Sequence, residues 1–162
     1  MERLDFASVM AVLRRNIPDE NFGNQADFLD SLFLDMGFSP QTAMDFDQGQ
    51  VCRWMNGLAR LSPNIISFYQ EKDNQRKLLR QIKERLLPLM PDSAMAVQEL
   101  YDLVLQAPNV SPQKKMELTD GYTFEDENDE AIFILDVLCL AMQLRFEKRD
   151  VRKKQLLTPG NL

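Results

Sequence analysis

The residues that are best suited to a chemical role lie close together near position 50. Gln48, Gln50 and Arg53 fall within six residues of one another, in the stretch DQGQVCRW. A glutamine amide can form two hydrogen bonds to the edge of adenine, and an arginine guanidinium can do the same with guanine. These three side chains are therefore candidates for contacts to the bases of a DNA duplex.

A basic segment follows these residues. Residues 51–90 hold 8 basic and 3 acidic side chains. Positive side chains near a base-contacting segment are suited to the phosphate oxygens, which fix the position of a protein on DNA. The candidate phosphate contacts are Arg60, Arg76, Lys77, Arg80 and Lys83.

The element that would position the polar group is a short helix. Val51, Trp54 and Met55 are spaced i, i+3 and i+4, which places them on one apolar side. We expect the helix to begin near Asp47 and to end at the Asn-Gly pair, residues 56–57. The indole of Trp54 would then face inward, and the glutamines and Arg53 would face solvent.

The stretch VCRWMNGLARLSP, residues 51–63, resembles the recognition-helix region of phage-repressor-like helix-turn-helix domains of the Cro/repressor class. The resemblance implies that Val51 is buried in the core, that Trp54 packs the helix against the rest of the domain and that Gly57 makes the turn. It also implies a DNA-binding N-terminal lobe. Two features depart from the family: Cys52 stands where serine is common, and the segment between Gly37 and Val51 is longer than the usual tight turn.

A structural interpretation of the same residues stays open. Asp47 would be an ordinary helix N-cap, Arg53 a surface residue and Trp54 a core aromatic. Asp45 and Asp47 also carry negative charge at the start of the helix, where they would repel phosphate.

The composition argues against catalysis. Histidine is absent, so the commonest general base and metal ligand is missing. The loops that cradle phosphate, GxGxxG and GxxxxGK, do not occur. Cys52 and Cys139 both fall in apolar helical patterns and are expected to be buried free thiols. We therefore predict that the protein is not an enzyme and uses neither a cofactor nor a metal.

The charges alternate in blocks along the chain. The net charge of −6 divides into −6 for residues 1–50, +5 for 51–90, −9 for 91–144 and +4 for 145–162. This pattern allows a second function, that of a small acidic inhibitor protein encoded by a phage or mobile element, for example an anti-CRISPR. Its acidic block would mimic nucleic acid or bind a host protein.

The fold class is predicted to be all-α, because apolar residues recur at helical spacing along the chain. Helices are expected at residues 6–17, 26–36, 47–56, 63–70, 74–87, 93–107, 111–120 and 125–148. Pro88 and Pro91 mark the expected boundary between a helix-turn-helix-like lobe, residues 1–90, and a C-terminal helical lobe, residues 91–162.

The last helix is predicted to be long and amphipathic, with acidic first turns and with Arg145, Lys148 and Arg149 in its last turns. We expect it to join two copies into a homodimer. The segment ENDEAIFILDVLCLAMQLRFEKRD, residues 127–150, also resembles a segment of mobile-element proteins that begin with a helix-turn-helix.

Neither a signal peptide nor a membrane span is predicted, so a cytoplasmic protein without membrane contact is expected.

Overall fold

The computed structural model of the protein describes residues 2–18, 53, 60, 63–120, 124 and 127–146. All regular elements in these ranges are helices, and none of the described residues lies in a strand, so the fold is all-α as predicted. None of the described helices is both long enough and apolar enough to span a bilayer. The predicted helix at residues 26–36 lies outside the described residues.

Local capping explains where several helices begin. Helix α1 (Phe6–Arg15) opens with a capping box, in which the Asp5 carboxylate accepts a bond from the Ser8 N–H at 2.8 Å and the Ser8 hydroxyl oxygen accepts one from the Asp5 N–H at 3.0 Å. Asp92 caps α7 (Ser93–Gln106), and Ser111 caps α8 (Pro112–Thr119). These caps satisfy N–H groups that have no partner inside the helix.

The basic segment forms a helix with three successive geometries. Helix α5 (Pro63–Gln70) leads into α6 (Lys72–Gln81), which continues as a π-helical turn, η2 (Ile82–Leu86), and a 3₁₀ turn, η3 (Leu87–Leu89). Pro88 has no N–H to donate to the carbonyl four residues earlier, which disfavours a regular α-helical end. The Leu87 N–H instead donates to the Ile82 carbonyl, five residues back.

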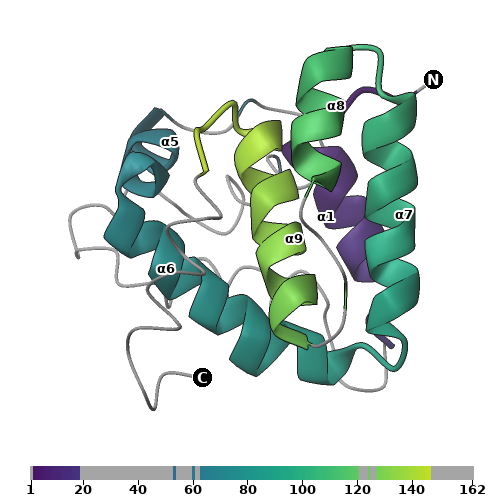
Figure 1. Cartoon of the computed structure of the whole chain (residues 1–162). Helices are drawn as coiled ribbons and strands as arrows, with labels where there is room; N and C mark the ends of the chain where they lie inside the picture. Colours follow the sequence, from purple (N-terminus) through teal and green to yellow (C-terminus); the bar gives the residue numbers. More distant parts are fainter. Residues whose placement is uncertain are drawn as a thin grey trace.

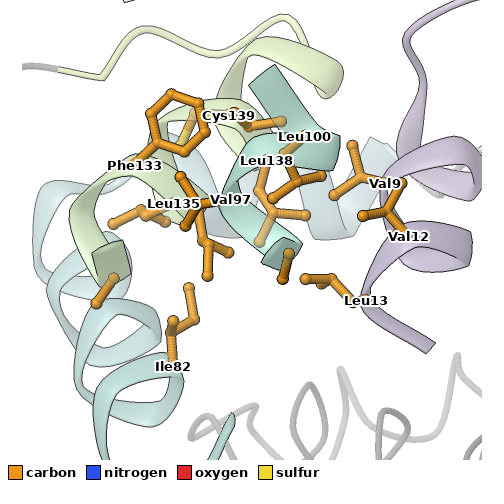
Figure 2. Packing of buried hydrophobic residues seen from close by; sticks show 14 of the residues in the cluster. Val9, Val12, Leu13, Ile82, Val97, Leu100, Phe133, Leu135, Leu138 and Cys139 are labelled. Atoms are coloured by element: carbon orange, nitrogen blue, oxygen red, sulfur yellow. The ribbon is translucent and has the colours of Figure 1, made fainter. Parts of the chain in front are cut away.

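Helix α9 (Glu127–Ala141) forms the centre of the described structure (Figure 1). It contacts α1, α6, η2, α7 and α8. Eight of the nine residues from Ala131 to Cys139 are buried, and Asp136 is half-buried. Figure 2 shows Phe133, Leu135 and Leu138 of this helix among apolar side chains from the surrounding helices. A helix that is apolar on all sides must be covered on all sides.

The prediction for this last helix was wrong in two respects. It ends at Ala141 rather than near Lys148, and between Ala131 and Cys139 its buried residues lie on all sides of the helix rather than along one stripe. The Leu144 N–H donates to the Cys139 carbonyl at 2.7 Å, and the Gln143 N–H donates to the Leu140 carbonyl at 3.0 Å. With Gln143 at φ 59°, these bonds form a Schellman motif, which stops the helix. Arg145 therefore lies beyond the helix, and Lys148 and Arg149 lie outside the described residues.

Helices from both sides of residue 90 share one hydrophobic core. Val9 and Leu13 of α1, Ile82 of η2 and Leu100 of α7 belong to the same cluster of buried residues (Figure 2). A polar contact also crosses this position, because the Asn109 side chain accepts a bond from the Leu4 N–H at 2.9 Å and donates one to the Leu4 carbonyl at 2.8 Å. The division into lobes of residues 1–90 and 91–162 stays a prediction.

Candidate nucleic-acid interface

Four of the predicted phosphate contacts share one side of the basic helix. Arg76, Lys77 and Arg80 lie on α6, and Lys83 lies in the adjoining η2 turn. Their spacing places them around one helical face, which we call the cationic face of α6. Lys77 and Arg80 are exposed, whereas Arg76 and Lys83 are half-buried.

The opposite side of the same helix holds the cationic face in place. The residues on that side are fully or nearly fully buried in the core: Leu78, Leu79, Ile82 and Leu86. A side chain with its backbone fixed in this way loses less conformational freedom on binding than one on a loose segment. The burial of the apolar side therefore gives the positive charges a defined arrangement.

Few negative charges neutralise this face. Arg76 forms an ion pair with Asp73, one turn earlier, and the Asp73 side chain is largely exposed. Among the described residues, no carboxylate forms an ion pair with Lys77, Arg80 or Lys83. Between Glu71 and Leu86 the chain carries six basic and three acidic residues, a net charge of +3. The face therefore keeps a positive charge for an anionic partner.

The candidate base-contacting residues are only partly described. Arg53 lies in a helical turn and is exposed, and Arg60 is exposed outside any helix. Gln48, Gln50 and Trp54 lie outside the described residues, so the inward position of the indole stays a prediction. The structure thus brings Arg76, Lys77, Arg80 and Lys83 together, and it places Arg53 and Arg60 at the surface.

Sequence reasoning missed one basic residue next to this region. The buried Gln75 of α6 donates through its side-chain amide to the Tyr69 carbonyl at 2.7 Å and to the Arg145 carbonyl at 3.2 Å. The backbone of Arg145 is therefore held against the buried side of α6, and its side chain is exposed. The approach of Arg145 to α6 follows the turn at Gln143, which the sequence did not predict.

The described acidic side chains of residues 91–144 lie on α9 as well as on α7 and α8 or at the ends of these two helices. Figure 1 shows α9 between α7 and α8 on one side and the α5–α6 segment on the other. Asp92, Asp102, Glu117 and Asp120 are exposed. The half-buried Glu99 forms an ion pair with Arg15 at 2.9 Å. The cationic face and these acidic residues are thus carried by different helices.

The one cysteine in the described residues is not placed for nucleophilic chemistry. Cys139 is fully buried in α9, as predicted, and Cys52 lies outside the described residues. Burial, with a smaller effect from the Asp136 carboxylate, raises the pKa of the Cys139 thiol to about 12. The thiol therefore stays protonated and weakly nucleophilic near neutral pH.

Metal ligands are not gathered in the part of the chain that the structure describes. There, no group of three or more Cys, Asp or Glu side chains is placed to hold a metal ion. The side chains that come together are cations on a helix whose other side is apolar and buried, and such cations are suited to binding anions.

In the comparisons with known proteins, no family, no curated protein and no solved structure matches this chain.

Proposed function

We propose that the protein is a sequence-specific regulator that binds double-stranded DNA in the cytoplasm, without catalytic activity or a cofactor. Gln48, Gln50 and Arg53 would contact base edges in the major groove. The cationic face of α6, together with Arg60, would contact the phosphates. The helix-turn-helix resemblance of residues 51–63 supports this assignment of roles.

The observation that carries the proposal is the cationic face itself. It presents four positive side chains from one helix whose other side is fixed in the core. Each phosphate that such a face neutralises releases condensed counterions from the duplex, which favours binding. Arg53 is exposed, which is what a contact to a base edge requires of its side chain.

The proposal includes a homodimer, because regulators of this class commonly read two half-sites about one helical turn apart. The dimer interface would not be the apolar surface of α9, since the described part of that helix is buried within one chain. Analytical ultracentrifugation of the protein with and without a selected duplex would measure its stoichiometry.

The direct test of the proposal is selection from a random duplex library with the purified full-length protein. We expect an enriched sequence motif, and we expect the selected duplex to bind at least about 10³-fold more tightly than a scrambled duplex. A library that stays random after repeated rounds, with equal affinity for both duplexes, would contradict sequence-specific recognition.

A second candidate function is the inhibitor role, in which the protein binds another protein. It is favoured by exposed apolar side chains on two neighbouring helices, namely Met95 and Leu105 on α7 and Met116 on α8. Exposed apolar side chains that form one patch rimmed by polar residues are typical of protein-binding surfaces. Under this function, Leu105→Asp with Met116→Asp would abolish capture of a host protein from lysate, and the triple substitution K77Q, R80Q and K83Q would leave that capture unchanged.

A further inference from the structure

Helix α7 carries a stripe of exposed side chains along one side. The stripe, which we call the outer face of α7, consists of Met95, Gln98, Asp102 and Leu105. At 3.6 residues per turn these four positions fall within about 80° of the helix circumference. Figure 1 shows α7 at the edge of the described structure, across α9 from α5. The outer face is therefore placed to meet another molecule.

The opposite side of α7 is fixed in the core. Val97, Leu100 and Val104 are buried there, in the cluster that also contains residues of α1 and α9. On the outer face, Met95 is 54% exposed and Leu105 is 42% exposed. Both apolar side chains contact water on a helix with a fixed position, so covering them with a partner is favourable.

The outer face suits a second copy of the chain because it is complementary to itself. Met95 and Leu105 lie five residues on either side of Leu100, and Gln98 and Asp102 lie two residues on either side of it. A two-fold axis at the level of Leu100 makes the α7 helices of two copies antiparallel. It places each Met95 against a Leu105 of the other copy. It also places each Gln98 amide, a hydrogen-bond donor, against an Asp102 carboxylate.

The polar pair at the centre of the outer face can form this additional contact. Within one chain the Gln98 amide donates to the Asp102 carboxylate at 3.1 Å. An amide nitrogen carries two hydrogens and a carboxylate accepts about four bonds, so each group can form a further bond. In the antiparallel pair the two carboxylates are offset by four residues, about 6 Å along the helix axis, and each lies opposite an amide.

Charge also favours this face for contact between two acidic molecules. Each copy has a net charge of −6, so two copies repel one another where many carboxylates face each other. Among the exposed residues within α7, Asp102 is the one that carries a charge. The antiparallel arrangement also brings the positive end of each helix dipole near the negative end of the other.

We propose that the outer face of α7 is a dimerisation surface, on which a second copy of the chain packs with its α7 antiparallel. This dimer is the homodimer of the proposed function and rests on that function for its role, but its formation does not require DNA. A helix of 14 residues extends about 21 Å, so a single helix pair is a small contact. We therefore expect a reversible dimer with a dissociation constant in the micromolar range.

The test is sedimentation equilibrium of the full-length protein without DNA, at about 1 to 200 µM. We expect M95K and L105E each to raise the dimer dissociation constant at least about 10-fold, because every dimer then sets a charge against an apolar side chain twice. A mixture of M95K and L105E should form heterodimers more tightly than either variant forms homodimers. In the mixed dimer the introduced lysine faces the introduced glutamate, and the other site keeps its Met95–Leu105 pair.

The matched control is a mixture of M95K and M95E, which carries opposite charges at the same position. In an antiparallel pair the two positions 95 do not meet, so this mixture should dimerise no better than M95K alone. Recovery in the control mixture, without recovery in the mixture of M95K and L105E, would overturn the antiparallel surface. Circular dichroism should show the same helix content for all variants, because both substituted residues are exposed.

The dimerisation surface and base recognition fail in different ways. A protein that stays monomeric up to about 200 µM, or a dimer that M95K and L105E leave unchanged, would overturn the surface. Met95 and Leu105 would then be left to a partner of another kind, and duplex selection would still test base recognition. Equal binding of the selected and scrambled duplexes would contradict sequence-specific recognition, and the mixing result would stand.

Discussion

Gln143 shows how one residue decides where a helix ends. Its φ of 59° lies in the left-handed region, which costs an L-amino acid with a Cβ about 1–2 kcal/mol. The two backbone bonds of the Schellman motif and the half-buried Leu144 offset that cost. Glycine is the usual residue at this position, and the sequence therefore carried no conventional sign of a helix end.

Replacing Gln143 with glycine should stabilise the protein. The substitution removes the steric cost of the Cβ, and the greater freedom of glycine in the unfolded chain offsets part of the gain. We expect the free energy of unfolding in urea to rise by up to about 1 kcal/mol for Gln143→Gly and to fall for Gln143→Val, since a branched Cβ fits this region poorly. Equal destabilisation by both substitutions would argue against the left-handed turn.

Cys139 predicts a loss of stability in alkali. Its thiol ionises near 9.0 in the absence of perturbation and near 12 in the folded protein. Above about pH 9 the unfolded chain releases this proton and the folded protein retains it. The free energy of unfolding should therefore fall by up to about 1.4 kcal/mol per pH unit until about pH 12. Burial also raises the pKa of Tyr69, which adds a similar loss at higher pH.

Urea unfolding at pH 7.5 and pH 10.5 measures this effect. Cys139→Ala should lower stability at both values, because it leaves a small cavity. It should also reduce the loss between the two values by about 2 kcal/mol, which is about 1.4 kcal/mol for each of the 1.5 pH units above 9. If Cys139→Ala lost as much unfolding free energy between pH 7.5 and pH 10.5 as the unsubstituted protein, the raised pKa of the Cys139 thiol in the folded protein would be contradicted.

At the scale of elements, α9 lies at the centre of the described core and packs against five of its neighbours. Phe133 is fully buried, and its ring packs edge-on against Phe124 with centroids 5.3 Å apart. Phe133→Ala should lower the free energy of unfolding by about 3–5 kcal/mol. Met116→Ala, on the exposed side of α8, is the control and should change it by less than about 0.5 kcal/mol. Comparable losses in the two variants would contradict the central position of α9.

The helices that the sequence predicted well are those with clear local signals. Proline at the first position begins α5 and α8, and the apolar periodicity of α1 and α7 agrees with their buried sides. The end of α9 and the π turn before Pro88 could not be predicted. The first depends on a glutamine in a left-handed conformation, and the second depends on how the helix end adjusts to a missing N–H.

The candidate site was predictable to a similar extent. The shared face of Arg76, Lys77, Arg80 and Lys83 follows from helical spacing, and the structure places them on it. The approach of Arg145 to α6 was not predictable, because it depends on a hydrogen bond between residues 70 positions apart. Local periodicity carries no information about such a contact.

At the scale of the whole molecule, a net charge of −6 is compatible with binding to DNA when the charges are segregated. The acidic residues of α7 and α8 would face away from a duplex bound at α6 and would oppose other orientations of the protein. On this account, association should slow steeply as salt is added, since steering by a charged face is screened over about 10 Å at 0.1 M ionic strength. Stopped-flow association rates at 50 and 200 mM salt would measure the effect, and equal rates would contradict it.

The central claim is that Arg53 reads a base while the cationic face of α6 holds phosphates. The most direct measurement is the affinity of Arg53→Ala and Lys77→Ala for the selected and the scrambled duplex at one salt concentration. Arg53→Ala should reduce the ratio of the two affinities by about 5- to 150-fold, equivalent to about 1–3 kcal/mol, with little change for the scrambled duplex. Lys77→Ala should weaken both equally. An unchanged ratio in Arg53→Ala would contradict the account.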